Sequence, residues 1–153
     1  MNAADTARMQ QLSAADIGLF RRVLALFGNA FDEPETYLGR PPTDEYLRGL
    51  LGSDQFIAVA AVHGDSVVGA LAAYELRKFE RERSEIYIYD LAVAADHRRR
   101  GIATGMIEHL KGIASARGAW VIFVQADRGD DPAIALYTKL GVREDVLHFD
   151  IEP

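Results

Sequence analysis

The stretch "SEIYIYDLAVAADHRRRGIATGMIEHLKG", residues 84–112, decides the fold of this chain. As far as Val93 it is a run of β-branched and aromatic residues typical of a strand, and from Gly101 to Arg117 it predicts a helix. The joint between the two carries three consecutive arginines, residues 98–100. A strand, a loop and a helix in this order are the building block of α/β proteins, so the stretch predicts an α/β (α+β) fold.

The flanking sequence predicts further helices and strands on both sides of this stretch. Upstream we expect a helix after Ser13 (14–31), a short helix capped by Thr43 (44–53), and a hairpin of two strands (55–62 and 67–76) around the turn "HGDS". Downstream we expect a strand (119–126), a helix (130–141) and a final strand (146–151). Strands joined first by a hairpin and then by helices imply a mixed central sheet, antiparallel in its N-terminal part and parallel in its central strands, flanked by about four helices.

Length and composition favour one domain over residues 1–153 and exclude several kinds of site. The 153 residues are 49% hydrophobic and 26% charged, which suits a single core. There is no cysteine, which excludes disulfides and thiolate nucleophiles, and the four histidines lack zinc-binding spacing, so we expect no metal. A net charge of -6 argues against a nucleic-acid partner, and no stretch approaches the roughly 20 apolar residues of a membrane span. We expect a cytoplasmic protein that could form a homodimer.

The arginine-rich joint has the features of an anion-binding site. A helix that begins there presents unpaired backbone N–H groups and about half a unit of positive charge at its first turn. Gly101 and Ala103 leave room for a phosphate to approach the backbone, and the three arginines add positive charge. The segment therefore predicts a pyrophosphate cradle. An ordinary solvated turn with a glycine bend explains the same residues equally well, so this alternative stays open.

Three motifs follow one another in the order and at about the spacing of a known protein family. They are "LAV" (91–93), "RRRGIA" (98–103) and "DPAIALYTKLG" (131–141). Through them the chain resembles the GNAT superfamily of N-acetyltransferases over nearly its whole length. Longer matches, among them "SEIYIYDLAV" and "VQADRGDDPAIALYTKLG", make it most similar to the type I aminoglycoside 3-N-acetyltransferases. It departs from the wider superfamily at Asp130, where many members have an asparagine.

The resemblance implies that acetyl-coenzyme A is the co-substrate and that its diphosphate is the anion at the joint. In this family the strand that carries "LAV" bulges and leaves main-chain groups free to pair with the pantetheine arm, and an amide of Leu91 or Val93 would stabilise the oxyanion. Backbone amides from Arg99 to Thr104 would hold the diphosphate. The implied cofactor-binding residues are Leu91, Ala92, Val93, Arg98, Arg99, Arg100, Gly101, Ile102, Ala103 and Thr104.

Asp90 is the candidate for removing a proton from the substrate amine. An ammonium group cannot attack a thioester until it loses a proton, and a nearby carboxylate can accept that proton. Regular strand alternation places Asp90 on one face with Ile86, Ile88 and Ala92, in a run apolar enough to be central in the sheet. Because an unpaired carboxylate there is costly, a structural aspartate paired with a backbone group or an arginine is the alternative.

Tyr137 is the candidate for assisting the departing coenzyme A thiolate. It matches the tyrosine of the superfamily's "AxxLY" helix, and the resemblance implies that its hydroxyl donates a hydrogen bond to the sulfur. Reference pKa values of about 10 for tyrosine and about 8.5 for a thiol make complete proton transfer uphill by roughly 2 kcal/mol, so donation is sufficient. The alternative is a core role, because Ala133, Leu136 and Leu140 form a helical stripe with Tyr137.

Acidic residues in loops and at the ends of elements predict a cationic small-molecule substrate. A polycationic amino sugar would bind a ring of carboxylates, for which the candidates are Asp32, Glu33, Glu35, Asp90, Asp130 and Asp131. Ordinary roles remain open for several of them. Asp131 precedes Pro132 and could cap the following helix, and the acidic residues between 32 and 35 could belong to a solvated loop.

The residues and the resemblance together predict an acetyl-coenzyme A dependent N-acetyltransferase. Its expected reaction is direct attack, in a ternary complex, by the 3-amino group of an aminoglycoside antibiotic such as gentamicin, which would confer resistance. A polyamine or protein amine is an alternative acceptor, and a non-catalytic coenzyme A-binding module is an alternative class. Asp90 and Tyr137 favour an enzyme, because a binding module would need neither residue.

Overall fold

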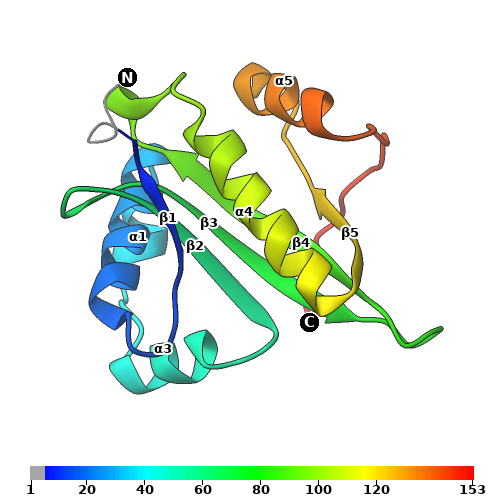
Figure 1. The fold of residues 1–153 in the computed structure, drawn as a ribbon, viewed down its shortest axis with the longest axis horizontal. Helices are drawn as coiled ribbons and strands as arrows, with labels where there is room; N and C mark the ends of the chain where they lie inside the picture. The colour runs from blue at the N-terminus through cyan, green and yellow to red at the C-terminus, as the bar shows by residue number, and fades with distance from the viewer. Residues whose placement is uncertain (1–5) are drawn as a thin grey trace. The chain divides into compact units, whose positions relative to one another are not determined.

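A five-stranded sheet organises the computed structural model, which describes residues 6–153 (Figure 1). The strands are β1 (Arg8–Gln11), β2 (Phe56–His63), β3 (Ser66–Arg77), β4 (Ser84–Val93) and β5 (Ala119–Val124), and they lie in the order β1-β2-β3-β4-β5. Strands β1 to β4 pair antiparallel, and β5 runs parallel to β4. The predicted α/β fold with a mixed sheet is confirmed.

Within the described residues, five α-helices and a short 3-10 helix connect or follow the strands. They are α1 (Ile17–Ala30), α2 (Pro34–Leu38), α3 (Asp44–Leu51), η2 (Ala95–His97), α4 (Ile102–Arg117) and α5 (Asp131–Leu140). The sequence patterns predict neither α2, which lies in a stretch rich in proline and glycine, nor the polar strand β1. Helix α1 begins with Asp16 as its N-cap residue rather than at Ser13.

The chain divides into two compact units, residues 1–123 and 124–153. The first unit, described from residue 6, holds β1 to β4, α1 to α4 and all of β5 except its last residue. The second unit holds α5 and the C-terminal segment. The expectation of one domain over residues 1–153 stays a prediction.

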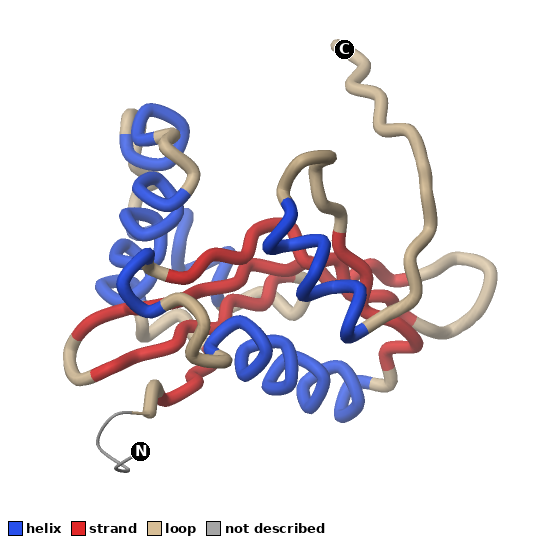
Figure 2. Tube along the Cα trace, turned by 90° about the horizontal axis from the view of Figure 1, so that it is seen from above, coloured by secondary structure: helices blue, strands red, loops and turns tan. Residues whose placement is uncertain are grey.

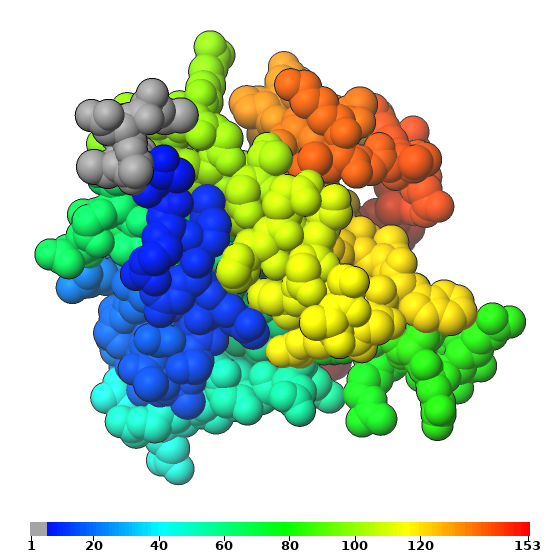
Figure 3. All heavy atoms as spheres, viewed as in Figure 1, coloured from blue at the N-terminus to red at the C-terminus, as the bar shows by residue number. Residues whose placement is uncertain are grey.

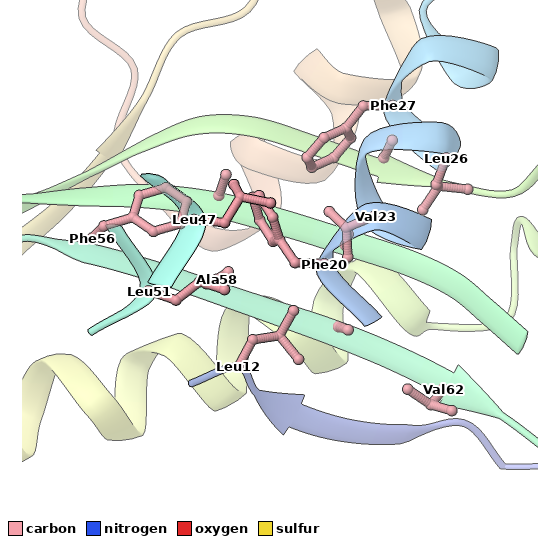
Figure 4. Packing of buried hydrophobic residues seen from close by; sticks show 14 residues of the cluster. Leu12, Phe20, Val23, Leu26, Phe27, Leu47, Leu51, Phe56, Ala58 and Val62 are labelled. Carbon is pink, nitrogen blue, oxygen red and sulfur yellow. The ribbon is translucent and has the colours of Figure 1, made fainter. Parts of the chain in front are cut away.

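Helices α1 and α3 cover one face of the sheet of the first unit with an apolar cluster (Figure 4). Phe20, Val23 and Phe27 of α1 are buried at helical spacing, so they lie on the side that faces the strands. Opposite them, β2 and β3 present small alanines, which let the helix approach the sheet closely. The cluster comprises Leu12, Phe20, Val23, Leu26, Phe27, Leu47, Leu51, Phe56, Ala58, Ala60, Val62, Ala70, Ala72 and Ala92.

Helix α4 packs on the opposite face of the sheet (Figure 2). Its residues Met106 and Leu110 are fully buried. A Cβ atom on Gly69 of β3 would stand 2.9 Å from the side chain of Ile102 and 3.2 Å from that of Met106, so a glycine there permits the close approach. This contact fixes the first turns of α4 against the sheet, directly after the arginine-rich joint.

The prediction of a final strand over residues 146–151 is wrong. Residues 142–153 contain neither helix nor strand. A strand exists only through hydrogen bonds to a neighbouring strand, and within residues 124–153 the other regular element is helix α5. An alternating apolar pattern alone therefore does not produce a strand in this unit.

Candidate active site

Strand β4 contains a one-residue bulge at Tyr89. On the partner strand β3, Ala73 lies opposite Ile88 and its neighbour Ala72 lies opposite Asp90, so Tyr89 is the extra residue. An extra residue reverses the side to which all following side chains point. The regular alternation of side chains between the two faces of the sheet is therefore interrupted immediately before Asp90.

The bulge turns Asp90 toward the face of the sheet that α1 covers. Directly paired residues point to the same face, and Ala72, the partner of Asp90, belongs to the apolar cluster on the α1 face. Asp90 shares this face with Ala92, as predicted. The expectation that it also lies with Ile86 and Ile88 is wrong, because these residues precede the bulge and point to the α4 face.

The side chain of Asp90 is hydrogen-bonded to Tyr37 of helix α2. The tyrosine hydroxyl donates to Oδ2 of Asp90 at 2.7 Å. The tyrosine ring is held by Phe27 and Phe31, with 5.8 Å between its centroid and each phenylalanine centroid. Asp90 therefore has a structural partner, and this partner is a tyrosine rather than the backbone group or arginine expected. Sequence analysis missed Tyr37 because it stands on a helix that the sequence pattern does not reveal.

The surroundings of Asp90 raise its pKa above the ordinary value. Burial is the largest cause because it disfavours the charged form; the hydrogen bond from Tyr37 acts in the opposite direction, and the negative charge of Glu33 raises the pKa further. The pKa of Tyr37 is also raised, first by burial and then by its bond to Asp90. The tyrosine thus remains a hydrogen-bond donor, and the carboxylate is a better proton acceptor than an exposed aspartate.

Glu33 is one of the predicted acidic residues that the structure brings close to Asp90. It is the N-cap residue of α2, and its charge acts on both Asp90 and Tyr37. Asp32 is exposed in the turn before α2, which agrees with a solvated loop, whereas Glu35 is exposed in the first turn of α2, so the expectation of a loop is wrong for this residue. Asp130 and Asp131 belong to the second unit.

Three tyrosines, Tyr74, Tyr87 and Tyr89, form an aromatic surface next to Asp90. The ring of Tyr89 contacts Tyr74 at 5.9 Å and Tyr87 at 5.8 Å between centroids, and Tyr87 stacks on Phe123 at 4.8 Å. Burial raises the pKa of Tyr74 and of Tyr87, and the charge of Asp90 contributes to both shifts. Tyr89 is 63% exposed. Sequence analysis missed this surface, for which the alternating "YIY" was the available signal.

The arginine-rich joint is an exposed turn between η2 and α4. Two of its residues have left-handed backbones, Arg99 with φ 61° and Gly101 with φ 76°. Nε of Arg98 donates to the carbonyl oxygen of Val93 at 3.2 Å and so ties the turn to the end of β4. The segment, yellow-green in Figure 3, projects from the surface at the top of the view. The predicted succession of strand, loop and helix is confirmed.

The first turn of α4 presents backbone donors without helical acceptors. Gly101 is the N-cap residue and supplies no side-chain cap, and the first helical hydrogen bond runs from the Gly105 amide to the Gly101 carbonyl at 2.9 Å. Amides 102–104 therefore lie before the helical ladder. Among the described residues, and apart from its chain neighbours, nothing lies within 4 Å of a Cβ placed on Gly101. These features fit a phosphate group at this turn.

The side chains of two predicted cofactor-binding residues serve the core. Ala92 and Ile102 are buried, the first in the apolar cluster and the second against Gly69. Only their main-chain groups can take part in binding.

Helix α5 of the second unit carries Tyr137. The helix begins at Asp131, and Oδ1 of Asp130 accepts a hydrogen bond from the Ala133 amide at 3.3 Å. Asp130 is therefore the N-cap, and the expectation that Asp131 takes this role is wrong because the helix includes Asp131. Burial, with a contribution from the charge of Asp130, raises the pKa of Tyr137. The hydroxyl is thus protonated at neutral pH and able to donate.

Two further features are absent from residues 6–153. Within this range, no three His, Asp or Glu side chains gather as metal ligands would. None of the helices described there has the length and apolar character that crossing a bilayer requires.

A comparison with protein families identifies a family of group-transfer enzymes. The mixed sheet, the bulged strand and the open start of α4 are consistent with it. Residues 21–142 match the model of the acetyltransferase (GNAT) family. The chain belongs to this family.

Solved structures of aminoglycoside acetyltransferases are similar to this chain. One, from an uncultured soil metagenomic sample, is 61% identical with a TM-score of 0.95, over 97% of this chain and 99% of that chain. Another, also from an uncultured soil metagenomic sample and solved in complex with sisomicin, is 28% identical with a TM-score of 0.90, over 99% of both chains.

A curated relative is named for a protein acceptor rather than an aminoglycoside. The [ribosomal protein bS18]-alanine N-acetyltransferase of Escherichia coli (strain K12) is 27% identical over 85 residues, which are 56% of this chain and 56% of the relative. The matched region thus spans about half the length of the curated relative.

Proposed function

We propose that this protein transfers the acetyl group of acetyl-coenzyme A to an aminoglycoside, at the 3-amino group as the family resemblance implies. The observation that carries the proposal is Asp90, a half-buried carboxylate that a bulge aims at the α1 face and that Tyr37 holds through one oxygen. The 61% identity to an aminoglycoside acetyltransferase supports the substrate class.

The turn before α4 would hold the diphosphate of acetyl-coenzyme A, which supplies the acetyl group as a thioester. Amides 102–104 donate hydrogen bonds, and the exposed arginines 99 and 100 add positive charge. Main-chain groups of residues 91–93 would accompany the pantetheine arm. One of their amides would donate to the carbonyl oxygen as negative charge develops on it.

Asp90 would act on the acceptor amine. A proton leaves the substrate ammonium group for the carboxylate, and the nitrogen lone pair then attacks the thioester carbonyl carbon directly. The carbon–sulfur bond then breaks, and the nitrogen gives up its remaining extra proton, which leaves with the sulfur, so that the products are the amide and the thiol of coenzyme A. The Tyr137 hydroxyl would donate a hydrogen bond to the thiolate as it departs. Because the pKa of Asp90 is raised, the carboxylate accepts a proton more readily than an ordinary aspartate does.

Charge and aromatic surface around Asp90 suit an amino sugar. Glu33 and Asp90 supply neighbouring negative charges for ammonium groups. The rings of Tyr74 and Tyr89 are partly exposed next to them, and aromatic faces attract both cations and the apolar faces of sugar rings. A polycation with a ring scaffold satisfies both features, whereas a linear polyamine satisfies only the first.

A protein amine is the second candidate acceptor. It is favoured by the similarity to an enzyme that acetylates the alanine of a ribosomal protein. The tyrosine surface distinguishes the two candidates, because a peptide N-terminus does not need sugar-ring contacts.

A substrate panel tests the proposed function. Acetyl-coenzyme A is supplied with each of four acceptors in separate reactions. The first acceptor is gentamicin, and the second is a different aminoglycoside, one that lacks a 3-amino group. The third is spermidine, and the fourth is a peptide with an N-terminal alanine. We expect turnover of gentamicin, with the acetyl group mapped to the 3-amino nitrogen by NMR, and little turnover of the other acceptors. Preferred turnover of the peptide would favour the second candidate. Coenzyme A binding by calorimetry without any acetyl transfer would instead identify a binding module.

Replacing Tyr137 with phenylalanine should lower kcat while the fold is kept. The change removes one hydroxyl and little volume, and the loss of one catalytic hydrogen bond costs about tenfold to a thousandfold in rate. Steady-state kinetics and thermal melting on the same preparation provide the measurement. Turnover equal to that of the wild-type protein would assign Tyr137 to a core role.

A further inference from the structure

Helix α2 is a short element whose position is fixed by aromatic packing. Tyr37 contacts Phe27 and Phe31 through its ring, and its Cβ lies 3.4 Å from where a Cβ on Gly28 of α1 would stand. The Glu33 amide also donates to the Gly28 carbonyl at 2.9 Å. The hydroxyl of Tyr37 is therefore held in one place by α1, independently of the partner it meets on β4.

That partner is Oδ2 of Asp90, at 2.7 Å. The hydrogen bond occupies one carboxylate oxygen and not the other. An aspartate side chain rotates freely about its terminal bond unless a contact stops it. A donor from a separate, rigid element fixes the rotation of the carboxylate plane and presents Oδ1 in one orientation.

We propose that Tyr37 is a positioning residue of the acetyl-transfer site, which holds Asp90 through Oδ2 so that Oδ1 is oriented toward the acceptor amine. This proposal rests on the proposed function, because it assigns Asp90 the role of proton acceptor. Tyr37 itself does not contact the reacting atoms. It acts through Asp90 alone.

The groups that face Asp90 determine how the loss of the Tyr37 hydroxyl changes its titration. Tyr37 and Glu33 face it from α2 and the start of that helix, Tyr74 from β3, and Tyr87 from its own strand. Burial and Glu33 raise the pKa of Asp90, and the hydrogen bond from Tyr37 lowers it. Removing that hydroxyl therefore leaves only influences that raise the pKa.

Tyr37→Phe tests the proposal, because it keeps the ring and its packing and removes only the donor. We expect the pKa of Asp90, followed by carboxyl-carbon NMR, to rise by about one unit, as the loss of one hydrogen bond to a charged group implies. The acidic limb of kcat/KM for the aminoglycoside should move to higher pH by the same amount. At high pH, where Asp90 is ionised in both proteins, kcat should still be reduced because the carboxylate is free to rotate.

Tyr46→Phe is the matched control, since Tyr46 of α3 is 63% exposed and loses the same hydroxyl. It should leave both the NMR titration and the pH profile unchanged. An unchanged Asp90 pKa and pH profile in Tyr37→Phe, with a wild-type enzyme that acetylates the aminoglycoside, would overturn the positioning role alone. A wild-type protein that transfers no acetyl group would contradict the proposed function. The NMR titration would still show whether the Tyr37 hydroxyl changes the pKa of Asp90.

Discussion

Replacing Asp90 with asparagine should lower kcat/KM for the aminoglycoside by about a hundredfold to ten-thousandfold, the range typical of a lost general base. Asparagine keeps the volume and an oxygen that can accept the hydrogen bond from Tyr37, so the fold should be retained. It cannot take a proton from the ammonium group. Steady-state kinetics across pH provide the measurement.

The change of kcat/KM with pH provides a second test of the role proposed for Asp90. In the proposed mechanism the carboxylate of Asp90 must be ionised. Burial and Glu33 raise its pKa, so kcat/KM should fall as the pH drops through a value above the ordinary pKa of aspartate. In Asp90→Asn this limb should disappear. Glu85→Gln is the matched control, because it removes another carboxylate from β4, one that pairs with Arg83. A destabilised Asp90→Asn protein with normal activity per folded molecule would show that the residue is structural.

Replacing Gly101 with leucine should raise the KM for acetyl-coenzyme A by about tenfold to a hundredfold, as expected when one or two hydrogen bonds to a phosphate are lost. The added side chain would enter the open space beside the turn, where nothing but chain neighbours lies within 4 Å among the described residues. It would thus obstruct the anion without displacing the core. Calorimetric titration with coenzyme A measures the same loss apart from turnover.

Gly118→Leu is the control for backbone strain. Gly118 ends the same helix with φ 73°, nearly the value of 76° at Gly101, and its surroundings are equally open. Both substitutions force a leucine into a left-handed conformation at a cost of roughly 1–2 kcal/mol in the free energy of unfolding. Only Gly101→Leu should weaken coenzyme A binding. If a folded Gly101→Leu protein binds coenzyme A with unaltered affinity, the diphosphate does not bind at this turn.

The features that sequence analysis predicted correctly depend on local patterns. Short runs of apolar residues separated by turn residues predict the hairpin around Gly64 and Asp65. The same kind of local pattern predicts the succession of β4, the arginine-rich turn and α4. The start of α4 is equally local, because a glycine and the first helical residues determine which amides lack acceptors; the binding of a diphosphate there stays a prediction.

The features that sequence analysis missed depend on contacts between distant residues. The hydrogen bond between Tyr37 and Asp90 joins positions 53 residues apart, and α2 is held by packing against α1 rather than by its own propensity. The family resemblance implies a bulge in this strand, but a bulge exists only in relation to the partner strand β3, so no pattern within β4 predicts its position at Tyr89. The prediction of a final strand is wrong for the same reason, because residues 146–151 lack a neighbouring strand within their unit.

The bulge at Tyr89 also bears on how such a site can arise in evolution. It amounts to one extra residue, so a single-codon deletion of Tyr89 would return β4 to regular pairing and leave Asp90 opposite Ala72, still facing α1. The deletion would remove the exposed ring of Tyr89 from its contact with Tyr74. Lineages can therefore gain or lose this aromatic ring through insertion or deletion of one residue, while the carboxylate keeps its orientation.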